Sequence, residues 1–114
     1  MKIDYRVNDM VTPEEMQLLE ESMGFGTDRN LERNRIALAG SLFTATASFE
    51  GKLIGMLRLI GDGAYILHIA GFSVHPEFQR KGVGSKLMKM AIDFAKVSEV
   101  GAGVLGRNGY RITY

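Results

Sequence analysis

Residues 71–95, which read GFSVHPEFQRKGVGSKLMKMAIDFA, decide the fold of this 114-residue chain. The segment passes from the end of an apolar strand, through a turn at His75-Pro76, into a helix that we expect from about Gly82 to Lys96. The buried side of that helix is predicted from apolar residues at helical spacing, namely Val83, Leu87, Ala91 and Phe94. Its polar side carries Lys86, Lys89, Asp93 and Lys96.

Two glycines, Gly82 and Gly84, and two cations, Arg80 and Lys81, surround the predicted start of this helix. A helix N-terminus leaves several backbone N–H groups without intrahelical acceptors and carries the positive end of the macrodipole. Because glycine lets an anion approach the backbone, the segment predicts a phosphate or pyrophosphate site. The alternative is a glycine-rich turn with solvated basic residues, since short glycine patterns recur by chance.

The composition is that of an ordinary globular domain, with 46% hydrophobic and 24% charged residues, and we expect a single domain over residues 1–114. The formal net charge of +1 predicts no general attraction to nucleic acid or to a membrane, so anion binding has to be local. The absence of cysteine excludes disulfides and thiol chemistry, and no metal site is expected. No window approaches the roughly 18 apolar residues of a membrane span, so we expect a cytoplasmic protein.

The N-terminal third predicts a strand followed by two helices. Ile3, Tyr5 and Val7 alternate with polar neighbours over residues 2–8, which is typical of a half-buried strand. The sequence Thr12-Pro13-Glu14-Glu15 combines a capping residue, a proline at the first helical position and a glutamate at the third, and so predicts a helix start. After a glycine-containing break, either Asp28 or Asn30 could cap a second helix.

Residues 42–74 change to the apolar pattern of strands. Turn signals at Glu50-Gly51 and at residues 61–63 divide them into three strands of a meander. The middle strand, residues 52–60, is apolar on both faces except for Arg58, so we expect it inside the sheet. The predicted order of elements is β-α-α-β-β-β-α-β, an α+β (mixed α/β) domain built around one sheet.

The turn and helix resemble a known motif. The V-H-P-like turn, the run Gln79-Arg80-Lys81-Gly82-Val83-Gly84 and the helix after it look like the acetyl-CoA-binding core motif, Q/R-x-x-G-x-G/A, of the GNAT superfamily of N-acetyltransferases. The resemblance covers residues 1–97 in architecture and is sharp over residues 65–95. It implies a GNAT-like acyl-CoA N-acyltransferase fold, with a mostly antiparallel sheet and one splayed strand.

The resemblance also implies how acetyl-CoA is bound as cosubstrate. The backbone of the turn and helix start would hold its pyrophosphate, through Gln79, Arg80, Lys81, Gly82, Val83, Gly84 and Ser85. The end of the preceding strand would pair with the pantetheine arm, through Phe72, Ser73 and Val74. An extended amide-containing arm can add to a strand as another strand does, so this role is physically reasonable.

The catalytic expectation follows from the same likeness. Amine acetylation needs positioning, a hydrogen bond to the thioester oxygen and removal of a proton. The N–H near Phe72 is the donor that the resemblance implies. Some family members carry a carboxylate eleven residues before the motif, and here that position is His68, which titrates near neutral pH. The alternative is a histidine packed beside Ile66 and Ala70 on one face of the strand.

The acceptor amine is not identified by any motif, and a small molecule or a protein could supply it. In GNAT folds the segment between the first two helices commonly lines the acceptor site, which assigns substrate-binding roles to Phe25 and Asp28. Helix capping by Asp28 is the alternative. The resemblance gives His75 a structural role in the turn.

The chain departs from the family pattern after the core helix. Residues 97–114 offer a short strand within residues 99–105, and we expect the usual last helix and strand to be lacking. Tyr110, Ile112 and Tyr114 alternate at strand spacing, so the tail could cover the edge of its own sheet or of a partner's, and a homodimer is predicted. The functional alternative to an acetyltransferase is a non-catalytic acyl-CoA-binding module or an inactive truncated remnant.

Overall fold

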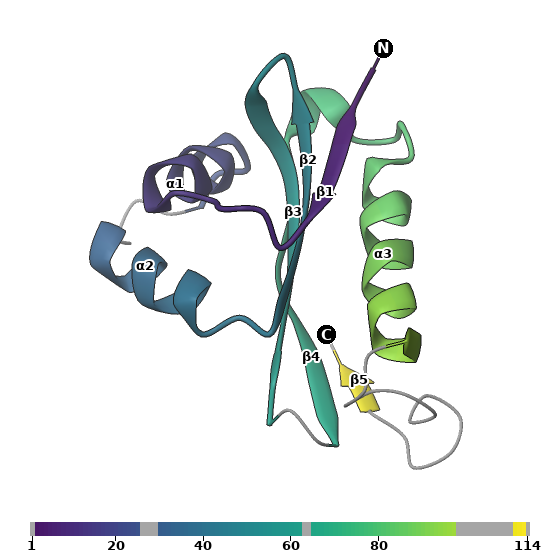
Figure 1. Cartoon of the computed structure of the whole chain (residues 1–114). Helices are drawn as coiled ribbons and strands as arrows, with labels where there is room; N and C mark the ends of the chain where they lie inside the picture. The colour runs from purple at the N-terminus through teal and green to yellow at the C-terminus, as the bar shows by residue number, and fades with distance from the viewer. Residues whose placement is uncertain (1, 26–29, 63–64, 98–110, 114) are drawn as a thin grey trace.

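The computed structural model describes residues 2–25, 30–62, 65–97 and 111–113 (Figure 1). The described elements, in chain order, are β1 (Asp4–Val7), α1 (Pro13–Ser22), α2 (Leu31–Ala39), β2 (Phe43–Phe49), β3 (Lys52–Gly61), β4 (Ile66–Val74), the 3-10 turn η1 (Pro76–Phe78), α3 (Val83–Val97) and β5 (Arg111–Thr113). The predicted α+β class is therefore confirmed.

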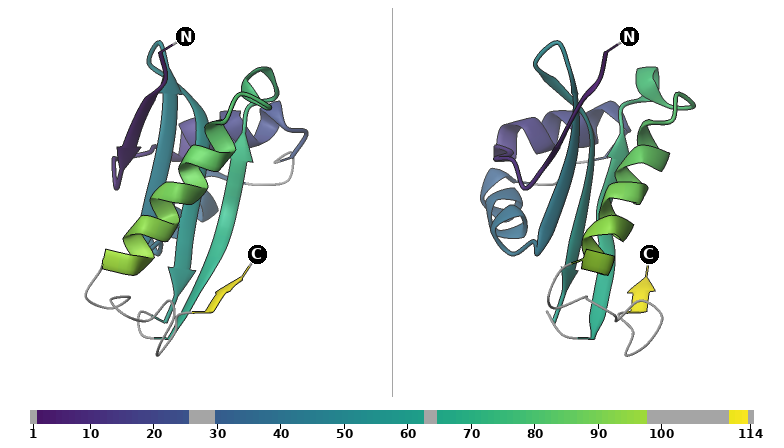
Figure 2. Two further views of the ribbon diagram at one scale, coloured as in Figure 1. Left: turned by 90° about the vertical axis from the view of Figure 1, so that its right-hand side faces the viewer. Right: turned by 45° about the vertical axis from the view of Figure 1, so that its right-hand side comes forward.

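One sheet organises the molecule, with the strand order β1-β2-β3-β4-β5. Neighbours from β1 to β4 run antiparallel, and β5 lies parallel to β4. The predicted meander is confirmed, and β3 has a neighbour on each side, as its apolar sequence indicated. Helices α1 and α2 cover one face of the sheet and α3 covers the other (Figures 1 and 2).

Local signals set the two N-terminal helices. The Thr12 hydroxyl accepts a hydrogen bond from the Glu15 N–H at 3.1 Å, and the Glu15 carboxylate accepts one from the Thr12 N–H at 2.9 Å. This is the predicted capping box. Asn30 caps α2 by accepting from the Arg33 N–H at 2.8 Å, whereas Asp28 lies outside the described residues.

The first strand is less buried than its pattern predicted. Ile3 and Tyr5 pack partly against the main core, but the side chain of Val7 is exposed. Val7 is the last residue of β1, and the next residue, Asn8, has a φ of 53° that turns the chain away from the strand direction. The alternation therefore ends one step earlier than expected.

The buried stripe of α3 consists of Val83, Leu87, Ala91 and Ala95, each at most 1% exposed. Phe94, which we expected in this stripe, lies at its flank, half-buried and stacked on Phe43 with ring centroids 4.5 Å apart. The residues that face the sheet follow one another at intervals of four, so the fourth of them is the small Ala95 and not Phe94. Burial of a leucine such as Leu87 contributes about 1.5–3 kcal/mol.

The described part of the C-terminal segment is β5, which pairs with Ile66–His68 at the beginning of β4. Of the two expectations for the tail, this is the one in which it covers its own sheet. The strand expected within residues 99–105 lies outside the described residues, as do Tyr110 and Tyr114. Among the described helices, none is long and apolar enough to cross a membrane.

Candidate functional site

A bulge interrupts β4 near its carboxyl end. Met56 is opposite Ser73 and Arg58 is opposite Ala70, so two steps along β3 correspond to three along β4. Gly71, within the extra step, has a φ of 61°, a value that L side chains rarely adopt. A bulge leaves one residue out of the regular ladder and re-aims its neighbours, and here it lies directly before Phe72.

The turn after β4 is held by two side chains. The His75 Nδ1 atom accepts a hydrogen bond from the Glu77 N–H at 3.1 Å, which gives His75 the expected structural role in the turn. The Gln79 side-chain amide donates to the Val74 carbonyl at 2.9 Å. Arg80 then takes a φ of 63°, so the chain reverses before the helix begins.

The helix start is built around Gly82. Its φ is 85°, and its carbonyl accepts the hydrogen bond of the Lys86 N–H at 3.0 Å. The next three amides, those of Val83, Gly84 and Ser85, belong to the first helical turn, where an N–H has no intrahelical acceptor. Gly84 and Ser85 reach the surface, so these amides are accessible to an anion, and the phosphate site expected from the sequence stays a prediction.

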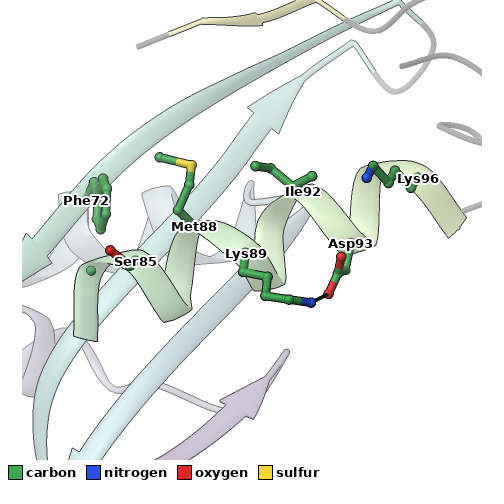
Figure 3. Close-up of a pocket in the computed structure, with 8 residues that line it drawn as sticks. Phe72, Ser85, Met88, Lys89, Ile92, Asp93 and Lys96 are labelled. Atoms are coloured by element: carbon green, nitrogen blue, oxygen red, sulfur yellow. Dashed lines mark hydrogen bonds and ion pairs between the residues drawn. The ribbon is translucent and has the colours of Figure 1, made fainter. Parts of the chain in front are cut away.

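A groove runs from this turn along α3. A hollow of about 290 Å³ is lined by Phe72, Val74, Gln79, Arg80 and Gly84. It shares Phe72 and Gly84 with a second hollow of about 630 Å³, which continues over Ser85, Met88 and Ile92 toward Lys96. Figure 3 shows Met88 and Ile92 on the side of α3 where Phe72 lies. The groove thus joins the helix N-terminus to the bulged part of β4.

Positive charge surrounds this groove. Arg80 and Lys81 are exposed, and neither has an acidic partner among the residues that the structure describes. Lys89 donates to the Asp93 carboxylate at 2.8 Å, and this hydrogen bond holds the pKa of Asp93 below its ordinary value (Figure 3). Within the described ranges, no three His, Cys, Asp or Glu side chains converge as metal ligands.

Comparison with known proteins decides the family. The sequence matches the acetyltransferase (GNAT) family over residues 10–105. This chain belongs to the GNAT family. It is 29% identical over 97 residues to an uncharacterized N-acetyltransferase from Gracilaria tenuistipitata var. liui, a match that covers 82% of this chain and 53% of the relative. The chain therefore spans about half the length of that curated relative.

Solved GNAT structures share the fold. A protein of unknown function from meticillin-resistant Staphylococcus aureus, described as a probable acetyltransferase, is 27% identical with a TM-score of 0.77 over 96% of this chain and 77% of its own. A GNAT acetyltransferase from Elizabethkingia anophelis with acetyl-CoA bound is 23% identical with a TM-score of 0.59 over 82% of this chain and 57% of its own. The GNAT-like fold expected from residues 65–95 is confirmed.

The predicted GNAT cofactor residues lie together in the structure. Phe72, Val74, Gln79, Arg80 and Gly84 line one hollow, and Ser85 lines the next. Ser73 and Val83 are buried beneath, so only their backbone could serve a ligand. Lys81 and Gly82 are exposed in the turn.

His68 lies apart from the groove. It is half-buried, opposite Ile60 of β3 and Thr113 of β5. Its neighbours Leu67 and Ile69 pack in the core beneath α3, so the His68 side chain points to the other face of the sheet. Phe72 is four positions further along β4, at most about 13 Å away at the rise of a regular strand. The structure therefore puts the candidate base and the cofactor groove on opposite faces of β4.

The acceptor residues are only partly described. Phe25 is 60% exposed, and its N–H donates to the Glu20 carbonyl at 3.0 Å at the end of α1. Asp28 lies outside the described residues, so its role stays a prediction.

Sequence reasoning missed Met88 and Ile92 as lining residues of the groove. A signal was present, because Gly84, Met88 and Ile92 recur every four residues, one position after the buried stripe. It also missed the contact between Arg58 and Gly71 beneath the bulge, which joins residues of two different strands.

Proposed function

We propose that this chain is an N-acetyltransferase, which transfers the acetyl group of acetyl-CoA to a primary amine of a small molecule or of a protein. The observation that carries the proposal is the groove that joins the first-turn amides of α3 to the bulged end of β4. Family membership and the acetyl-CoA bound to the Elizabethkingia anophelis relative support it.

The proposed cofactor position follows the groove. The pyrophosphate lies against the turn from Gln79 to Ser85, where the amide dipoles are positive. The pantetheine arm extends along Phe72–Val74 and pairs with the edge of β4 beyond the part that β5 covers. Arg80 and Lys81 add local charge at the entrance, which suits a ligand with several phosphates.

The proposed reaction is direct transfer. The neutral amine nitrogen attacks the thioester carbon, negative charge develops on the carbonyl oxygen, and the carbon–sulfur bond then breaks. The backbone N–H near Phe72 stabilises that oxygen. The proton that the attacking nitrogen loses goes to the departing CoA thiolate, and the proton that the substrate ammonium loses before the attack passes to a base. We assign this last role to His68, acting through water because its side chain lies on the far face of β4.

Two measurements on the same preparation test the proposal. Calorimetry with acetyl-CoA measures binding, and a thiol reagent measures CoA release with a panel of polyamines, aminoglycosides, amino acids and peptides that carry free amino groups. We expect micromolar binding and CoA release with at least one class of amine. Binding without release across the panel would support the non-catalytic acyl-CoA-binding module instead, and an absence of binding would overturn both.

A matched pair of variants locates the cofactor. Replacing Arg80 and Lys81 by alanine removes cations at the groove, whereas Arg33→Ala removes an exposed cation from α2. We expect the double variant to weaken acetyl-CoA binding, with a smaller dependence on salt, and Arg33→Ala to leave it unchanged. Equal affinity in both variants would contradict a phosphate site at the turn.

A further inference from the structure

A buried arginine lies beneath the bulge of β4. Arg58 is only 9% exposed and occupies the middle of β3, which is otherwise apolar after its first residue, Lys52. Long cationic side chains are rarely buried unless polar partners hold them, because removing a charge from water is costly. The burial of Arg58 therefore indicates that specific polar groups around it hold the guanidinium.

The end of α2 holds the guanidinium. Arg58 Nη1 donates to the Ala37 carbonyl at 3.3 Å and to the Ser41 hydroxyl at 3.1 Å. The Ser41 hydroxyl in turn donates to the Ala37 carbonyl at 2.9 Å. The C-terminal end of a helix presents carbonyls without intrahelical donors and the negative end of the dipole, so it suits a cation.

The other side of the same guanidinium meets Gly71. A Cβ atom placed on Gly71 would lie 2.9 Å from Arg58 Nε and 3.2 Å from Nη2. Gly71 also has the positive φ of the bulge. Two independent reasons thus require glycine at this position, the backbone conformation and the arginine that fills the space beneath it.

We infer that Arg58 is the residue that positions the β4 bulge, and with it the backbone N–H groups that meet the thioester. The guanidinium contacts the end of α2 on one side and Gly71 on the other. It therefore fixes the distance of β4 from α2, and the direction of the β4 backbone, just before Phe72. The catalytic part of this inference rests on the proposed function. A buried positive charge at this point also favours negative charge that develops on a carbonyl oxygen at the bulge.

A double-mutant cycle on stability tests the contact without any assay of activity. Gly71→Ala introduces both the strained φ and the close approach to Arg58, whereas Gly51→Ala, with a φ of 79° and nothing within 4 Å of its Cβ, introduces only the strain. Arg58→Leu removes every guanidinium atom from beneath Gly71. The folding equilibrium constants of the single and double variants are measured by urea denaturation.

We expect Gly71→Ala to lower the folding constant more than Gly51→Ala does in the parent chain. In the Arg58→Leu background the two substitutions should cost about the same, which corresponds to a coupling on the order of tenfold between positions 58 and 71. Effects of Gly71→Ala that are equal in both backgrounds, within about twofold, would overturn the contact. Gly51→Ala should be insensitive to Arg58 in every case.

Kinetics then test the positioning role. Arg58→Lys keeps the charge and an atom at the Nε position, whereas Arg58→Leu keeps neither. We expect Arg58→Leu to lower kcat by about tenfold or more while KM for acetyl-CoA changes little, because the anion site on α3 is separate. Arg58→Lys should recover part of the loss. A loss confined to KM, or equal kcat in all three proteins, would overturn the inference. If Arg58→Leu does not fold, Arg58→Lys alone should still lower kcat relative to the parent.

Failure of the proposed function is distinguishable from failure of this inference. If the parent chain releases no CoA with any amine, the stability cycle still reports whether Arg58 and Gly71 are coupled. If Arg58 and Gly71 are coupled in a chain that shows no activity, the contact between them is supported and only its proposed effect on catalysis is refuted.

Discussion

Gly84→Leu is the substitution that separates the cofactor role of the glycine turn from its role in the fold, because the family motif accepts alanine at this position but not a larger side chain. Gly84 belongs to the first turn of α3 and, unlike Gly82, has no positive φ. An added Cβ would lie 3.5 Å from Phe72 Cζ and 3.8 Å from Val74 Cγ2, which is ordinary contact. The first side-chain carbon therefore fits the protein, but the rest of a leucine side chain would extend into the hollow where the phosphates are proposed to lie.

The two effects should have opposite signs. Leucine, like alanine, is about 0.5–1 kcal/mol more favourable than glycine in a helix, so the melting temperature should rise by about 2–6 °C. A phosphate pushed away from the first-turn amides loses one charge-assisted hydrogen bond, which is worth about 1.5–3 kcal/mol. The affinity for acetyl-CoA should then fall by roughly 10- to 150-fold.

Thermal melts and calorimetry with acetyl-CoA measure the two quantities on the same preparation. Gly40→Leu at the C-terminal end of α2 is the matched control, because Gly40 is exposed, its Cβ would lie 3.4 Å from the Ile36 carbonyl oxygen, and it lies outside the groove. That variant should bind acetyl-CoA as the parent does. A Gly84→Leu protein that is stabilised and still binds with parental affinity would refute a phosphate site at this helix end.

Three further predictions concern other parts of the chain. His68→Ala should lower kcat about 100-fold at neutral pH while acetyl-CoA affinity stays constant, and a fully active folded variant would return His68 to a packing role. Deleting residues 107–114 removes β5 from the edge of β4 and should lower the melting temperature. Because we propose a homodimer built on this edge, the mass at sedimentation equilibrium should also fall. A deletion that changes neither quantity would contradict both the stabilising role of β5 and the dimer. The Lys89 hydrogen bond lowers the pKa of Asp93 from its ordinary 3.8, so its small stabilisation is complete above that pH and disappears as pH falls through the lower folded value. Asp93→Asn should therefore lower the melting temperature slightly at pH 7 and not at about pH 2, with less effect in high salt; a difference that persists in acid would exclude this pair as its cause.

Much of the fold was predictable because its signals are local. The capping box at Thr12 and Glu15 involves atoms three residues apart, so the sequence places the start of α1 without knowledge of the rest. The glycine turn before α3 is likewise local, since Gly82 takes the positive φ that few other residues tolerate. Phe94 and Val7 are less buried than predicted. Periodicity shows which face of a helix or strand is apolar, but not how much of that face the neighbouring elements cover.

The sequence by itself determined the order of elements from β1 to α3, the start of α1 and the glycine turn before α3, because each depends on interactions within a few residues. Only the tertiary structure decided that Arg58 meets Gly71 beneath the bulge, and that His68 and the groove lie on opposite faces of β4. Those relations depend on register. One extra residue in β4 relative to β3 moves every later side chain of β4 to the opposite face. The pattern within one strand does not show how many residues of the neighbouring strand lie opposite it.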